Sequence, residues 1–261
     1  MNLPLAPPQV PYFATYSAIN QSLSGNAASQ VSSQKEEVNL NPAYVNNALL
    51  PPDGTTSWYT YFQTLIKKNY TGTYLTFNPN GSNTISSHLG VTSNNGTILV
   101  AQAPANTDIV IPANTICDEA TVILIDGKLT LYPNFTIGGT VNKNGCIFIA
   151  SGDILIGNTI QSNVPLGSTA SAQYESVFAQ FVTDKEFATY RGYFNPQYPN
   201  KGVGLYLNGG VIANQVTLQR DLNYTGNSGQ PAHIFEFDPK YRELFRDVFA
   251  ITKYSIREVT N

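Results

Sequence analysis

The sequence predicts a mainly β protein, a right-handed β-solenoid-like stack of sheet with a few peripheral capping helices. Three observations support this fold class. Thr121–Asn158 consists of short apolar runs separated by Gly, Asn and Asp, without helical spacing. Within it, Ile125–Leu131 resembles Ala150–Ile156 at an offset of about 25 residues, which lies in the period range of stacked repeats. Only 12% of the residues are charged, against about 25% in a typical soluble domain.

The first 55 residues are expected to form an arm or linker with little regular structure. Prolines cluster at both ends of this segment, and the tract Ser22–Gln34 between them consists mainly of small and polar residues. Ala18–Val31 could be partly helical, but its apolar side chains are too small to form a strong helical stripe. Residues 56–261 are expected to form one β-rich domain, because a chain of 261 residues is long enough to bury a large core.

The first regular element of this domain is a predicted helix over Ser57–Asn69. Its large apolar residues fall on one face, and Lys67 and Lys68 lie at the end where the helix dipole favours cations. Asn-Gly pairs at 80–81 and 95–96 then indicate tight turns between strands. The predicted strands of this half are Gly72–Phe77, Thr97–Gln102, Asp108–Ile111 and those of the repeat in Thr121–Asn158.

The second half alternates loops of small and polar residues with further strands. Glu175–Phe187 is compatible with either a helix or a strand, and Asn208-Gly209 is interpreted as a turn between two short strands. A C-terminal helix over about 239–249 is predicted after Asp238 as N-cap and Pro239 at the first helical position, and is expected to cap the last rung. The predicted strands are Gly204–Leu207, Gly210–Ala213, Gln215–Leu222 and His233–Phe237.

The two cysteines, Cys117 and Cys146, each lie at the edge of an apolar run. Their spacing is close to one unit of the repeat, so a disulfide between neighbouring rungs is one interpretation, worth roughly 3 kcal/mol through loop closure. Two buried free thiols are the other interpretation, because unpaired Cys is among the most buried residue types. Neither cysteine has a nearby His in the sequence, so no metal site is predicted.

Charge and hydropathy exclude two classes of partner. The net charge of −3 gives no basic field that would attract phosphate backbones, so no nucleic-acid partner is predicted. No run of about 18 apolar residues is present, so we expect no membrane contact by this segment itself. The N-terminal residues have neither a basic leader nor a continuous apolar core, so a signal or anchor for export is expected to lie outside this sequence.

Carboxylate pairs are the residues that a carbohydrate-active enzyme on a β-helix would use as acid and base or nucleophile. Asp126 and Asp153 stand beside Gly127 and Gly152, which explains them as turn residues. Because a structural role accounts for them, no catalytic residue is predicted. The three candidate pairs are Asp118/Glu119, Asp126/Asp153 and Glu236/Asp238.

The histidines and glycines carry no catalytic or cofactor motif. His88 lies in a predicted Ser/Gly loop and His233 begins a predicted strand, and neither belongs to a nucleophile-elbow or zinc-protease pattern. The Gly-rich segments lack the phosphate-binding patterns. No cofactor is therefore expected.

Aromatic residues in the loops are the candidate contact surface. Exposed aromatic side chains bind sugars and protein partners, although packing of the loops onto the sheet is the alternative explanation. The residues singled out are Tyr190, Tyr193, Phe194, Tyr198 and Tyr224.

Four segments after residue 145 carry a resemblance to known surface proteins: Phe178–Asp184, Gly204–Leu222, Pro231–Pro239 and Arg257–Val259. The resemblance is to type IV pilus-associated or pilin-like cell-surface proteins of candidate-phylum bacteria, and it implies a β-rich, polymer-forming-like domain with structural motifs. It carries over no active-site residue, and the hydrophobic pilin-like start of that family is absent from this sequence.

These observations together predict a non-enzymatic extracellular or cell-surface protein. The expected role is structural or adhesive, as the soluble part of a pilus-associated or cell-surface protein that acts in attachment or assembly. Its expected partners are other pilus or surface proteins, or surface glycans. Two alternatives stay open: a carbohydrate-active enzyme on a β-helix, and a subunit of a self-assembling filament or capsid.

Overall fold

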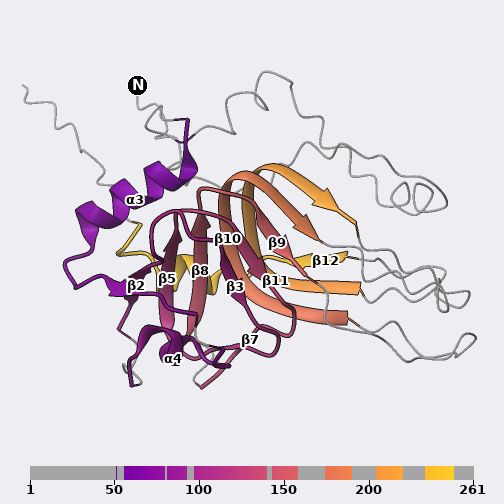
Figure 1. The fold of residues 1–261 in the computed structure, drawn as a ribbon, viewed down its shortest axis with the longest axis horizontal. Helices are drawn as coiled ribbons and strands as arrows, with labels where there is room; N and C mark the ends of the chain where they lie inside the picture. The colour runs from indigo at the N-terminus through magenta and orange to yellow at the C-terminus, as the bar shows by residue number, and fades with distance from the viewer. Residues whose placement is uncertain are drawn as a thin grey trace, which may run out of the picture.

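The computed structural model describes residues 51, 56–79, 81–92, 97–139, 143–157, 174–189, 204–219 and 233–249. Within these ranges the chain forms three helices and twelve strands (Figure 1). The helices are α3 (Trp58–Asn69), α4 (Ile85–Leu89) and α5 (Lys240–Leu244). The strands are β1 (Leu75–Thr76), β2 (Leu99–Gln102), β3 (Ile109–Ile111), β4 (Ile116–Cys117), β5 (Ala120–Ile125), β6 (Leu129–Leu131), β7 (Thr136–Ile137), β8 (Gly145–Ala150), β9 (Ile154–Ile156), β10 (Tyr174–Thr189), β11 (Gly204–Leu218) and β12 (His233–Glu236).

All the strand pairings in these ranges are parallel, and the strands stack in rows. One row runs β1-β2-β5-β8 and a second runs β3-β6-β9, while β4 and β7 form a separate pair. The long strand β10 joins the two rows, because Gln180–Thr183 pair with β8 and Phe187–Thr189 pair with β9. The result is a curled parallel sheet, a half-barrel, to which β11 and β12 add (Figure 1).

The predicted repeat appears in the register of the paired strands. Ile125 pairs with Ala150 and Leu129 with Ile154, so neighbouring rungs are offset by 25 residues at this point. The turns that connect the two rows also stack on one another, since the Gly152 N–H donates to the Gly127 carbonyl at 2.9 Å. The predictions of a mainly β fold and of stacked sheet are therefore confirmed.

Both faces of the middle strands are covered, which explains their unbroken apolar sequence. All six residues of β5 are buried. Ile123 and Ile125 point into the curl and belong to the inner core. Val122 and Leu124 point outward and pack with side chains of α3 and of the segment 241–248. Fully burying one such aliphatic side chain contributes about 1.5–3 kcal/mol.

The inner core is a set of ladders in which equivalent residues of successive strands lie on one another. Ile123 is in register with Phe148, and Phe148 with Phe181. The rings of Phe148 and Phe181 are stacked, with centroids 5.7 Å apart, and Phe135 meets Phe148 edge-on at 5.6 Å. Stacked and edge-on ring pairs add to the free energy gained by burial alone.

Helix α3 confirms the predicted helix and covers the outer face of the sheet. Ser57 caps it by accepting a hydrogen bond from the Thr60 N–H at 3.0 Å, and its hydroxyl donates to Asp184 of β10 at 2.7 Å. Burial, reinforced by the negative charge of Asp126, raises the pKa of Tyr59 to about 12. Phe62 and Ile66 are also buried against the sheet. The cap and the aromatic face together fix the helix on the outer face of β8 and β10.

Helix α5 lies within the predicted C-terminal helix. Asp238 is predicted as its N-cap, whereas in the structure Pro239 holds that position and Asp238 Oδ1 accepts a hydrogen bond from the Lys240 N–H at 2.9 Å. Tyr241 and Phe245 are buried in the same outer cluster as α3. Among the described residues, no helix is long and apolar enough to cross a membrane. The predicted arm, apart from Pro51, lies outside the described residues.

The structure decides one prediction of local structure that was open and contradicts another. The segment compatible with helix or strand is a strand, β10, in which residues alternate between the two faces. The turn predicted at Asn208-Gly209 is wrong, because β11 runs through both residues without a break. A Cβ atom on Gly209 would lie 2.0 Å from the carbonyl oxygen of Ala179, so glycine is required by the close approach of two strands.

Substitution of this glycine provides a test of the strand packing. Gly209→Ala is expected to lower the free energy of unfolding by about 2 kcal/mol or more, because its φ of +150° and the contact with β10 both exclude a side chain. Gly210→Ala is the matched control, since its nearest neighbour, Gln180, would lie 3.9 Å from the added carbon. Urea denaturation measures both variants. Equal stability of the two would contradict the described packing.

Candidate functional site

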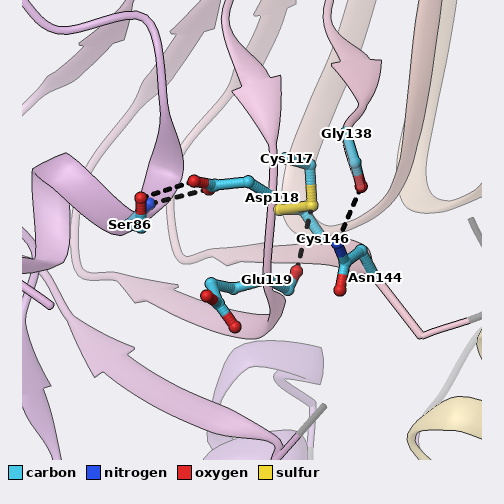
Figure 2. The surroundings of a disulfide bond; sticks show 7 residues. All are labelled: Ser86, Cys117, Asp118, Glu119, Gly138, Asn144 and Cys146. Carbon is cyan, nitrogen blue, oxygen red and sulfur yellow. Dashed lines mark hydrogen bonds between the residues drawn. A yellow bond between two sulfur atoms is a disulfide. The ribbon is translucent and has the colours of Figure 1, made fainter. Parts of the chain in front are cut away.

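The two cysteines meet where the small sheet joins the large one. Cys117 ends β4 and Cys146 lies in β8, and both side chains are fully buried. Their sulfur atoms lie 2.15 Å apart, at disulfide distance, and their Cα atoms are 6.1 Å apart (Figure 2). Of the two interpretations of the sequence, the structure therefore supports the cross-link. The disulfide joins the end of β4, just before β5, to β8, the strand that pairs with β5.

Polar groups around the cysteines form hydrogen bonds at the same junction of the two sheets. The Asp118 carboxylate accepts hydrogen bonds from both the backbone N–H and the hydroxyl of Ser86, at the start of α4 (Figure 2). The Asn144 amide donates to the Gly138 carbonyl at 2.7 Å, and the Gly145 N–H donates to the Glu119 carbonyl at 3.2 Å. In Figure 2 the Glu119 side chain points away from the sulfur atoms. These bonds fix the loops between rungs.

The pair Asp126/Asp153 lies at the turns between the two rows of strands. Asp126 accepts a hydrogen bond from the Ser151 hydroxyl of the next rung at 3.0 Å. Asp153 forms an exposed ion pair with Lys128 at 3.4 Å and accepts from the Glu186 N–H at 3.4 Å. Each carboxylate thus ties its own turn to a neighbouring rung, as the turn interpretation predicts.

The pair Glu236/Asp238 lies at the far end of the sheet. Glu236 accepts a hydrogen bond from the Tyr206 hydroxyl, and this bond raises the pKa of Tyr206 above its ordinary value. Asp238 pairs with Lys240 at 3.2 Å. Five of these carboxylates therefore have side-chain or backbone partners on different parts of the fold: Asp118, Asp126, Asp153, Glu236 and Asp238.

The histidines lie on different parts of the fold. His88 is predicted in a loop, but it is buried in α4 with its ring 5.3 Å from that of Phe77. Burial lowers the pKa of His88. His233 begins β12, and its Nε2 lies 2.8 Å from the Thr189 hydroxyl. Among the residues that the structure describes, no group of three or more His, Cys, Asp or Glu is placed to hold a metal ion.

The aromatic contact surface predicted for the loops lies outside the described residues. Those residues are Tyr190, Tyr193, Phe194, Tyr198 and Tyr224. Within the described ranges, the most exposed aromatic side chains are instead Phe235, 45% exposed, and Phe237, 54% exposed, in and just after β12. The sequence signal for them is the alternation in His233–Phe237, combined with the position of this segment as the last predicted strand.

Comparisons of the chain with protein-family models, with curated proteins and with solved structures found no match.

The cross-link is expected to contribute strongly to stability. The double variant Cys117→Ala/Cys146→Ala should lose roughly 3–4 kcal/mol of unfolding free energy, because the unfolded chain is no longer constrained by a loop of this length. Denaturation of the oxidised and reduced wild type and of the double variant measures this difference. Reduction should destabilise the wild type and leave the variant unchanged. Identical curves for the oxidised and reduced wild type would contradict the cross-link.

Proposed function

We propose that this chain is a non-enzymatic extracellular protein with a structural or adhesive role, built on a right-handed β-solenoid. In this proposal it is the soluble part of a pilus-associated or cell-surface protein that acts in attachment or assembly. The observation that carries the proposal is the buried pair of Cys117 and Cys146 at disulfide distance within a parallel stack. Structural disulfides persist in oxidising compartments, above all outside the cell.

The stack itself supports a mechanical role. Its central strands are hydrogen-bonded on both edges and buried on both faces, so they form a stiff body. The low fraction of charged residues, 12%, is typical of surfaces that rely on neutral polar groups for solubility. Both features fit a protein that presents contact surfaces on a rigid support.

The partners of the carboxylates support this role, because Asp118, Asp126 and Asp153 each have a structural contact of their own. A glycosidase needs two carboxyl groups about 5–10 Å apart on either side of the scissile bond. Here Asp118 binds Ser86, Asp126 binds Ser151, and Asp153 binds Lys128. Hydrogen bonds and ion pairs of this kind keep the carboxylates at turns, where they stabilise the connections between rungs.

The test of this proposal is the state of the protein on intact cells that produce it. The cells are lysed directly into denaturant that contains a thiol-blocking reagent, so that buried free thiols are also blocked, and the protein is then reduced, labelled and weighed by mass spectrometry. We expect both cysteines to be labelled only after reduction, and we expect a protease added to intact cells to cleave the chain. Thiols that are blocked before reduction, together with protection from the protease, would contradict an extracellular role.

A separate assay addresses the enzymatic alternative. The purified protein is incubated with a panel of polysaccharides, beside the variants Asp126→Asn and Asp153→Asn. Under the proposal, the wild type releases no reducing sugar from any of them. Release by the wild type that both variants abolish would establish the carbohydrate-active enzyme instead.

A further inference from the structure

The aromatic ring of Phe235, in the last strand of the sheet, lies exposed at the end of the inner core. Phe235 of β12 is in register with Leu207 of β11, and Leu207 with Val177 of β10. Val177 and Leu207 are fully buried, whereas Phe235 is 45% exposed. The apolar ladder therefore continues to the edge of the sheet, where no further rung among the described residues covers it.

The backbone edge of β12 forms a surface together with the exposed Phe235 side chain. Within the described ranges β11 is the strand with which β12 pairs, and the other edge of Ile234–Glu236 offers backbone groups for another strand. Phe237, directly after the strand, is 54% exposed. An open strand edge beside exposed alternate side chains is the arrangement that strand addition uses: backbone bonds supply affinity, and the side chains select the partner.

We propose that β12 is an interface between two copies of this chain, which pair their β12 strands antiparallel about a two-fold axis. The inference is independent of the proposed extracellular role, since it concerns only the edge of the sheet. Around such an axis the same residues meet on both sides, so the patch must be complementary to itself.

The side chains select one register for this pairing. With Phe235 opposite Phe235 of the second copy, the two exposed rings form a cross-strand aromatic pair, a stabilising combination. Glu236 then lies opposite Ile234. A shift of the axis by one residue would place two Glu236 carboxylates opposite each other, and like charges directly across a pair are unfavourable. Glu236 is, in addition, held by the Tyr206 hydroxyl of its own chain.

Head-to-tail addition to the opposite end of the stack fits less well. The first strand, β1, contains two residues, whereas β12 contains four. A second β12 therefore offers the longer complementary edge. Two-fold pairing also closes after two copies, while head-to-tail addition continues into a filament.

A cysteine scan tests the pairing and its register together. Directly opposite residues in an antiparallel pair have Cα atoms about 4.5–5.5 Å apart, which a disulfide spans. Phe235→Cys is therefore expected to form a covalent dimer on mild oxidation, since the native cysteines are already paired. Phe237→Cys should not, because four residues of strand separate the two copies of position 237 by roughly 13 Å. Val110→Cys, at a site 50% exposed on β3, controls for random collision.

Light scattering of the unmodified chain provides a second measurement. Its mass is expected to rise from 28.4 kDa to twice that value as the concentration increases. Phe235→Lys should remain a monomer, whereas Val110→Lys should still dimerise. Circular dichroism shows that each variant is folded. A wild type that stays at 28.4 kDa at every concentration, together with cross-linking of Phe235→Cys no faster than that of Val110→Cys, would overturn the proposal. Growth beyond the dimer would overturn the two-fold arrangement.

Discussion

The in-register pairing of β5 with β8 determines where the rest of the chain lies. Six residues of each strand pair, from Ala120 with Gly145 to Ile125 with Ala150. Because both strands end in stacked turns, the strands that follow them, β6 and β9, pair as well. The same register brings Cys146 beside Thr121, close to the end of β4 where Cys117 lies. The inner core, the second row and the cross-link are thus consequences of one pairing.

The repeat was predictable because its turns and its apolar runs recur together. Gly127 and Gly152 stand at equivalent turns, and a Cβ on Gly152 would lie 2.7 Å from the Gly127 carbonyl oxygen. Residues between the turns alternate between inner and outer faces, and each side is covered by apolar groups. In such a repeat, each residue pairs with the equivalent residue of the next repeat, so the sequence pattern predicts both the strands and their offset.

Other features depend on contacts that no local pattern contains. Asn208-Gly209 has the composition of a turn, yet Gly209 serves the close approach of β11 to Ala179. His88 sits in a stretch rich in Ser and Gly, but burial of its neighbours Ile85 and Leu89 makes that stretch a helix. The exposure of Phe235 follows only from its position at the edge of the sheet. For the candidate site, the sequence predicted turn roles for Asp126 and Asp153 correctly, since both stand beside glycines.

Asp118, Asp126 and Asp153, together with the disulfide between Cys117 and Cys146, connect successive strands and their turns. The central claim, that the β5–β8 pairing organises the structure, is tested most directly by native-state hydrogen exchange. Amides of Val122–Leu124 and Ile147–Ile149 should exchange only through global unfolding, with a denaturant dependence equal to that of the whole chain. Exchange of these amides through local opening, before those of β12, would contradict the account.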